Sequence, residues 1–296
     1  YQMFLFGTDY FLERIMLPGG LADYVSEFLV QFYYMPVLGG TIIALLLVGI
    51  QTMVWGLMKQ YGVKHDFPGH LLSFVPSIVL WCAMGDQNVL LSFVVALWGA
   101  LTMGWIHNCF HNRLVKVVFE LVSTALVYWC LGPVVYVYAA LMIGDTMKLG
   151  AQKRQVSSAV AYSLCILILT FSWILLCTQT LQYPLYRILS GLNYYRFPGV
   201  VPVMLLGVMA CAAFVPLLGM VSYKHPQLQK LQQSRMVVTV TYVLVAIASW
   251  WGIKVSFDEM SYELIDYNFL VRTEQWDKII EKAEKKPAST PLGVSC

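Results

Sequence analysis

The sequence predicts an all-α fold: a polytopic α-helical transmembrane bundle of about eight spans, with interfacial helices and a C-terminal extracytoplasmic helix pair. Between Pro36 and Ile253, apolar runs of about twenty residues recur, the length that a helix needs to cross a hydrocarbon core about 30 Å thick. The composition agrees, because 59% of the residues are hydrophobic and only 12% are charged, outside the range of soluble domains. The run from Val156 to Thr178 has no charged side chain, whereas a soluble helix needs one polar face.

Residues 1–35 mix acidic and aromatic residues and are too polar to span a membrane. Apolar residues recur at helical spacing over 20–34, where Asp23 and Glu27 lie one turn apart, after a turn at Pro18-Gly19-Gly20. This pattern predicts an interfacial helix that lies along the membrane surface.

The transmembrane domain, residues 36–253, follows this segment. Two places in it are unusual for membrane spans. At Leu131-Gly132-Pro133 one short turn must reverse the chain, and one short span contains Pro76. From the apolar runs we place the spans at 36–58, 69–84, 89–107, 114–131, 133–147, 156–178, 200–221 and 236–253.

Basic residues on the connections between spans predict the orientation, because cytoplasmic loops carry an excess of lysine and arginine. The side with the excess is predicted to be cytoplasmic, so the opposite, outer face holds residues 1–35, the loop 179–199 and the tail from Lys254. We expect the protein to lie in the cell (inner) membrane. Because this places Tyr1 outside, we expect a further span before it. Ten basic residues lie on one side, against Arg14, Arg187 and Arg196 on the other: Lys59, Lys64, Arg113, Lys116, Lys148, Lys153, Arg154, Lys224, Lys230 and Arg235.

Residues 254–296 change character, because they hold eight of the sixteen acidic residues of the chain. Helical periodicity predicts two amphipathic helices over 256–286 with a break near Arg272-Thr273-Glu274. We expect Trp276 to pack between them or against the last span. One such pair cannot bury its own apolar face, so the segment predicts the start of a helical-repeat domain that continues beyond Cys296.

Inside the spans the sequence offers little chemistry. Glu120 lies one turn after Lys116, and Asp145 lies near Lys148, so we interpret both acids as locally neutralised. This counts against an ion pump. His107, Cys109 and His111 have a spacing that suggests a metal site, but no further ligand accompanies them, and no metal or cofactor is predicted. His65, His70 and His225 are expected to be solvated.

The two longest outer connections are the candidate site. Asp9 and Glu13 lie on the first, and Arg187 and Arg196 lie on the second beside Tyr194 and Tyr195. A carboxylate deprotonates an acceptor hydroxyl, while a guanidinium binds phosphate oxygens through two parallel hydrogen bonds. Tyrosine and arginine also sit among lipid headgroups without any catalytic role, so that reading stays open.

Two resemblances rest on these features. The stretch TDYFLERIMLPGGLADYVSEFLVQFYYMP, with the tetratricopeptide-like start of the tail, resembles an uncharacterised bacterial family of multi-span proteins with a helical-repeat extracytoplasmic tail. The order of outer loop, bundle, second outer loop and outer tail resembles the C-type glycosyltransferases. That resemblance implies a lipid-phosphate-linked sugar as donor, Asp9 or Glu13 as the catalytic acid, and Arg187 or Arg196 as the lipid-phosphate contact.

Three functions therefore remain open from the sequence. They are a glycosyltransferase-like enzyme at the outer face, a noncatalytic scaffold that presents the tail to a protein partner, and a transporter. The partners expected are membrane lipid, a polyprenyl-phosphate-linked sugar and a protein bound by the C-terminal helices, with no nucleic acid.

Overall fold

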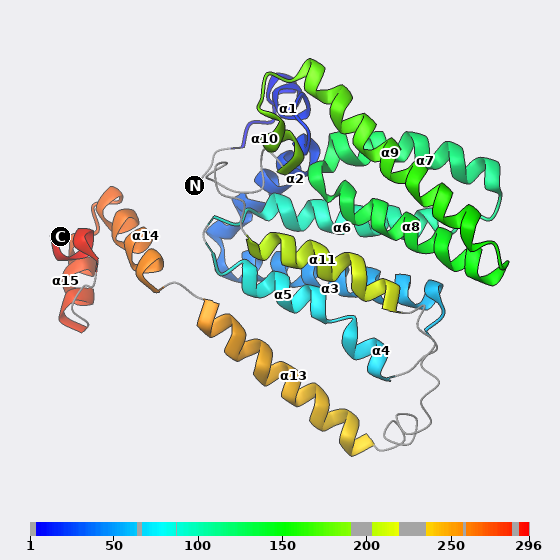
Figure 1. Ribbon diagram of the computed structural model, residues 1–296. Coiled ribbons are helices and arrows are strands. Elements are labelled where there is room, and N and C mark those ends of the chain that lie inside the picture. Colours follow the sequence, from blue (N-terminus) through cyan, green and yellow to red (C-terminus); the bar gives the residue numbers. More distant parts are fainter. Residues whose placement is uncertain are drawn as a thin grey trace.

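The computed structural model describes residues 4–63, 67–86, 88–190, 203–218, 235–256, 259–285 and 290–295. These residues form helices joined by turns, and no strand occurs among them. The predicted all-α class is therefore confirmed. Figure 1 shows the main helices side by side, with the C-terminal helices set away from them, while α13 contacts α5 at the edge of the bundle.

The chain begins with two short helices, α1 (Thr8–Ile15) and α2 (Gly20–Val30), followed by the 3-10 turn η1 (Gln31–Tyr34). Gly20 closes the turn between α1 and α2, because a Cβ there would lie 1.8 Å from the carbonyl oxygen of Arg14. The predicted helix over 20–34 is thus present in two parts. On an ordinary surface helix the charged residues face the solvent, but here Asp23 and Glu27 are buried while Phe28 is 36% exposed.

The helices that follow pack mainly on α3, α6 and α8. Figure 1 shows successive long helices of this bundle running in opposite directions. Their bounds are α3 (Pro36–Tyr61), α4 (Phe67–Leu72), α5 (Val75–Ala83), α6 (Leu91–His107), α7 (Arg113–Leu131), η2 (Gly132–Val134), α8 (Val135–Gln152), α9 (Val156–Thr180), α10 (Leu185–Ser190), α11 (Val203–Leu217) and α13 (Arg235–Ser256).

Four stretches of the described chain are long and apolar enough to cross a membrane. They are Pro36–Tyr61, Arg113–Gln152, Val156–Thr180 and Val238–Ser256, and three shorter apolar helical stretches accompany them at Gly69–Ala83, Leu91–His107 and Met204–Leu217. These features fit a membrane protein. Each predicted span range contains helix, but the number of crossings stays a prediction.

The stretch Arg113–Gln152 is not one straight helix. It folds back at Gly132, which has φ 76° and ψ −144°, a backbone conformation that a residue with a Cβ adopts only with strain. The Ser123 hydroxyl of α7 lies 2.6 Å from that of Tyr138 on α8, so α7 and α8 form an antiparallel hairpin. The predicted reversal at Leu131-Gly132-Pro133 is therefore confirmed.

The predicted span 69–84 is divided in two. Helix α4 ends at Leu72, and α5 begins at Val75 with Pro76 in its first turn. Proline has no backbone N–H, so it fits the first turn of a helix but breaks an interior one. The proline that was unusual for a continuous span thus marks the start of a second helix.

Helix α6 lies at the centre of the bundle. Ten of its residues between Leu91 and Gly104 are buried, and each of them is either apolar or small. Phe93, Leu97 and Leu101 are fully inaccessible. By contrast, Leu164, Ile168 and Leu176 of α9 are more than half exposed. A long helix with one apolar face on the protein and another facing outward is typical of a bilayer environment.

The tail forms α14 (Glu259–Arg272), α15 (Trp276–Lys285) and the short α16 (Pro291–Ser295). The predicted break is confirmed, because α14 ends at Arg272 and the turn contains Glu274 at φ 55°. The prediction for Trp276 is wrong, since its side chain is 52% exposed. Tyr267 of α14 is 1% exposed and packs in the small apolar cluster instead, because it lies at the centre of the contact with α15 and α16.

Candidate functional site

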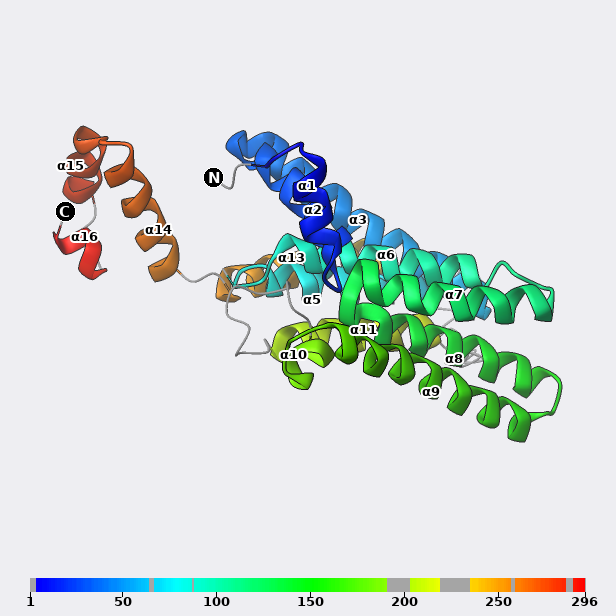
Figure 2. The same cartoon turned by 90° about the horizontal axis from the view of Figure 1, so that it is seen from above.

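The outer-face residues predicted to act together are only partly described. Asp9 and Glu13 are exposed on α1, and Arg187 on α10 stacks 5.6 Å from the Tyr183 ring centroid. Arg196, Tyr194 and Tyr195 lie outside the described residues. Helices α1 and α10 overlap in Figure 1 but are drawn apart in Figure 2.

Two neighbouring residues at the end of α7 explain this separation. The Trp129 indole donates to the carbonyl of Ile15, at the end of α1, over 2.8 Å. The Tyr128 hydroxyl donates to the carbonyl of Ile188 in α10 over 3.1 Å. The end of α7 thus lies between α1 and α10. The convergence of Asp9 and Glu13 with the arginines stays a prediction.

A cluster between α1 and α2 accounts for the buried acids. The guanidinium of Arg14 contacts both carboxylate oxygens of Glu27, at 3.1 and 2.8 Å, and lies 3.9 Å from Asp23. The Tyr10 hydroxyl also donates to Glu27. Burial, reinforced by the Glu27 charge and opposed by Arg14, raises the pKa of the Asp23 carboxyl to about 6. Glu27 is therefore fully occupied in holding α1 to α2.

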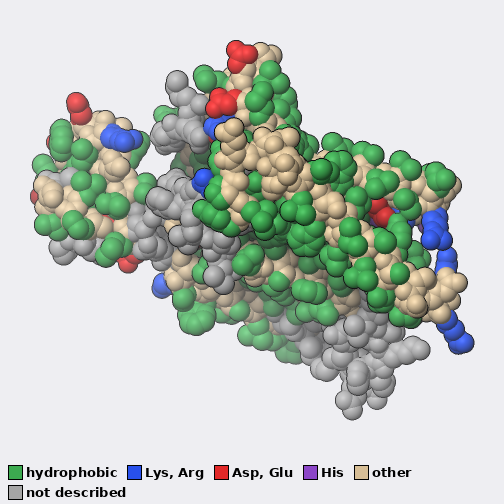
Figure 3. Space-filling view, turned by 45° about the horizontal axis from the view of Figure 1, so that its top comes forward, with side chains coloured by type: hydrophobic (Ala, Val, Ile, Leu, Met, Phe, Trp, Pro, Cys, Tyr) green, Lys and Arg blue, Asp and Glu red, His purple; other side chains and the backbone are tan. Residues whose placement is uncertain are grey.

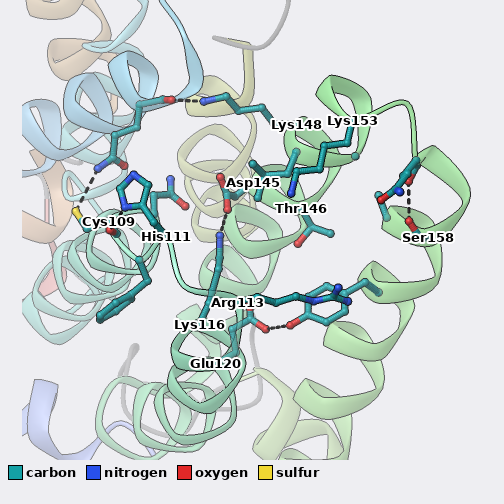
Figure 4. A pocket seen from close by; sticks show the side chains of 18 of the residues that line it. Cys109, His111, Arg113, Lys116, Glu120, Asp145, Thr146, Lys148, Lys153 and Ser158 are labelled. Carbon is teal, nitrogen blue, oxygen red and sulfur yellow. Dashed lines mark hydrogen bonds and ion pairs between the residues drawn. The ribbon is translucent and has the colours of Figure 1, made fainter.

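A large cavity lies at the opposite end of the bundle (Figure 4), where α3, α6 and α8 end and α7 and α9 begin. Its volume is about 1020 Å³, at the upper limit of the range typical of ligand sites. In Figure 3, blue side chains form a column at the right-hand edge, and red and blue atoms are visible in a recess between apolar ridges beside it. Residues from three separate connections of the chain meet here.

The cavity carries an excess of positive charge. Arg113, Lys116, Lys148 and Lys153 line it, against the two carboxylates of Glu120 and Asp145. The sequence predicts this end to be cytoplasmic from the same basic residues, but their gathering around one cavity was not foreseen.

Both carboxylates are already paired within the protein. Lys116 of α7 forms an ion pair with Asp145 of α8. Lys148 donates to the backbone carbonyl of Gln60 at the end of α3, where a cation satisfies an exposed carbonyl. Within the described part of the chain, Arg113, Lys148 and Lys153 have no carboxylate within ion-pair distance. These three cations supply the unbalanced charge.

Two helix N-termini add to this field. Helix α7 begins at Arg113, with Asn112 as its N-cap, and α9 begins at Val156, next to the lining residues Ser157 and Ser158. The partial positive charge of a helix N-terminus favours a nearby anion and disfavours a cation. Placing Arg113 at such an end is unfavourable unless an anion binds there. The backbone and the side chains therefore favour the same kind of ligand.

Glu120 belongs to a buried network in the wall of the cavity. It is 3% exposed, and its Oε1 lies 2.7 Å from Nε2 of His107, whose side chain is fully buried. Its second oxygen accepts a hydrogen bond from the Tyr162 hydroxyl of α9. The predicted pairing of Glu120 with Lys116 is therefore wrong, and so is that of Asp145 with Lys148, because contacts between helices replace contacts one turn apart.

The histidines and the cysteine near the end of α6 do not converge. His107 points to Glu120, while Nδ1 of His111 lies 2.9 Å from the carbonyl oxygen of Cys109. No group of three or more potential metal ligands occurs in the described ranges. His70 is not simply solvated as predicted, because its Nδ1 lies 2.6 Å from the Tyr242 hydroxyl of α13. His65 and His225 lie outside the described residues.

One pattern in the sequence of α7 could have indicated this site. Lys116, Glu120, Ser123 and Thr124 recur at helical spacing on α7 and form one polar stripe. In the structure, this stripe faces inward, while Leu121, Val122 and Leu126 face outward. A polar stripe on an otherwise apolar span predicts a buried face.

Comparison with known proteins identifies the family. A model of a family of unknown function, DUF6057, matches residues 1–296. The chain belongs to DUF6057. No curated protein and no solved structure matched the chain. The expected membership of an uncharacterised family is confirmed in this form, while the comparisons lend no support to the glycosyltransferase or tetratricopeptide resemblance.

Proposed function

We propose that this member of DUF6057 is an integral membrane protein that binds a phosphate monoester. The binding site is the basic cavity where α6 and α8 end and α7 and α9 begin. The observation that carries the proposal is the charge balance. Both carboxylates of the cavity are paired, whereas Arg113, Lys148 and Lys153 have no described carboxylate partner.

A phosphate monoester matches this site in charge and in geometry. It carries about two negative charges at neutral pH and offers three acceptor oxygens, against the formal excess of two positive charges in the cavity. Guanidinium and ammonium groups are the usual phosphate ligands in proteins. The cavity of about 1020 Å³ also has room for an organic group beside the phosphate.

The same ligand chemistry comes from two sources, a lipid headgroup and a soluble phosphate ester. The cavity lies among helix ends, and the outward faces of α7 and α9 beside it carry exposed Leu114, Val115 and Val160. These apolar faces favour a ligand that reaches the cavity from the bilayer.

The finer hypotheses from the sequence stand beside this one as proposals. A glycosyltransferase acting on a lipid-phosphate-linked sugar shares the ligand class but requires Asp9 or Glu13 and Arg187 or Arg196 at the other end. The scaffold hypothesis depends on the tail. Transport is the second candidate, because buried ionisable residues such as His107 and Glu120 in an apolar bundle commonly mark solute or proton pathways.

The test is a binding measurement on the protein in phosphatidylcholine nanodiscs. In both arms the shift in the unfolding transition is measured: glycerol 3-phosphate is added in one arm, and the nanodiscs contain phosphatidic acid in the other. A stabilising shift is expected because ligand binding favours the folded state. Stronger stabilisation by phosphatidic acid identifies the lipid source, and a response to glycerol 3-phosphate alone identifies a soluble ligand.

Variants connect binding to the cavity. Arg113→Gln and Lys153→Gln are each expected to weaken binding by about ten- to a hundredfold, since a hydrogen bond to a charged group contributes roughly 1.5–3 kcal/mol. Arg154→Asn is the matched control: Arg154 neighbours Lys153 but does not line the cavity, and its φ of 56° suits asparagine. No binding in either arm, or an equal loss in the control, would refute the proposal.

A further inference from the structure

Beneath the basic rim, the wall of the cavity holds an acid that is sealed from water on its other sides. Glu120 lines the cavity, yet the residue is only 3% exposed, and His107 behind it is 0% exposed. Burying a charged carboxylate in an apolar bundle costs several kcal/mol unless it is paired or takes up a proton. Here the carboxylate is paired with His107 and accepts a hydrogen bond from Tyr162, so a carboxyl group and an imidazole share one buried position.

Titratable groups from every helix around Glu120 face it. His107 comes from α6, Asp145 and Tyr138 from α8, and Tyr162 from α9, while Lys116 and Arg113 lie on α7 itself. Among the described residues, His107 and Tyr162 contact the carboxylate directly, whereas Lys116 is held by Asp145. The ammonium group of Lys116, one helical turn before Glu120, is thus already paired, and the direct partners of the Glu120 carboxylate are an imidazole and a hydroxyl.

The proton path leads to the cavity and not through the bundle. Farther along α7, Ser123 bonds to Tyr138, and then buried Val127 interrupts the polar stripe before Tyr128 at the far end. Asn108, beside His107, and Tyr162, beside Glu120, both line the cavity. A proton that reaches Glu120 or His107 therefore comes from the cavity side.

We propose that Glu120 and His107 form a proton-binding site that is coupled to anion occupancy of the cavity, so that ligand binding takes up one proton from solution. This rests on the proposed phosphate binding. A bound anion adds negative charge beside Glu120, which disfavours the ionised carboxylate and the neutral imidazole. Coupling of this kind is reciprocal, so protonation strengthens anion binding by the same factor.

The first measurement needs no ligand. Infrared difference spectra of the protein in phosphatidylcholine nanodiscs follow the carbonyl band of a protonated carboxyl group as the pH is changed. A titrating band is expected in the wild-type protein and should be lost in Glu120→Gln. Tyr162→Phe is the milder variant; because it removes a hydrogen bond to the same carboxyl group, the frequency of its band should shift. If the band is unaffected by either substitution, the proposal is wrong.

The second measurement tests the coupling with two probes, glycerol 3-phosphate and sulfate. Sulfate keeps its charge over the pH range used, whereas a phosphate monoester takes up a second proton at about pH 6, so the pH dependence is read from sulfate. Calorimetry in buffers of different ionisation enthalpy should report uptake of about one proton per anion, and the dissociation constant should rise by up to about tenfold per pH unit. Glu120→Gln should bind sulfate with little pH dependence.

The outcomes separate the two proposals. Anion binding without proton uptake overturns the coupling but leaves the phosphate site intact. Absence of anion binding overturns both, whatever the infrared band does. Proton uptake that persists unchanged in Glu120→Gln assigns the proton to another group and also overturns the inference.

Discussion

Replacing Asp23 by asparagine should stabilise the protein at neutral pH. In the folded protein, burial against α1, together with the charge of Glu27, raises the pKa of Asp23 from 3.8 to about 6. The folded state therefore binds the proton more tightly than the unfolded state. The stability gained from this proton is fully present below about pH 4 and is lost as the pH rises through about 6. A difference of about 2 pH units corresponds to about 3 kcal/mol at 1.36 kcal/mol per unit.

The assay is the free energy of unfolding of wild-type and Asp23→Asn protein in detergent micelles between about pH 4 and 8. Asp23→Asn should exceed the wild type by up to about 3 kcal/mol at pH 8, with the gap closing as the pH falls. Asp9→Asn is the control, since Asp9 is exposed on the neighbouring helix and should change stability by less than about 0.5 kcal/mol. A constant difference at every pH, or a less stable variant at pH 8, would refute the electrostatic reasoning.

Two further predictions concern packing. Gly150→Ala should destabilise the protein by about 1–3 kcal/mol, because the added Cβ would lie 2.3 Å from the Cβ of Ala159. Gly40→Ala is the control: its added Cβ meets no atom within 4 Å, so the substitution should be neutral or stabilise the protein by up to about 1 kcal/mol. In the tail, Tyr267→Ala should lower the stability of the helical tail by about 3 kcal/mol or more and make α14 and α15 accessible to limited proteolysis. Trp276→Ala should leave the cleavage pattern unchanged, because Trp276 is 52% exposed.

The ends of most helices could be predicted because they depend on local features. Apolar runs, the glycine at position 132 and the proline at position 76 act within a few residues of themselves. The break in the tail is equally local, since it follows the change in periodicity after Arg272. These features yielded the all-α class and the long helices, but not the short helices α1, α10 and α16.

The candidate site could not be predicted in the same way. Lys116 and Glu120 are one turn apart and of opposite charge, so local reasoning pairs them, but in the structure each finds a closer partner on another helix. Asp145 is 29 residues from Lys116 along the chain, and His107 is 13 residues from Glu120. Sequence spacing does not reveal which helices become neighbours.

The sequence alone therefore determined the fold class and the positions of the long helices, because periodicity and composition are properties of single segments; the sidedness that the basic residues suggest stays a prediction. Only the tertiary structure decided that Asp23 and Glu27 face inward, and that Arg113, Lys148 and Lys153 surround one cavity above Glu120. The physical reason is that the cost of burying a charge depends on which partners packing brings within a few ångströms, and packing joins segments that are far apart in the chain.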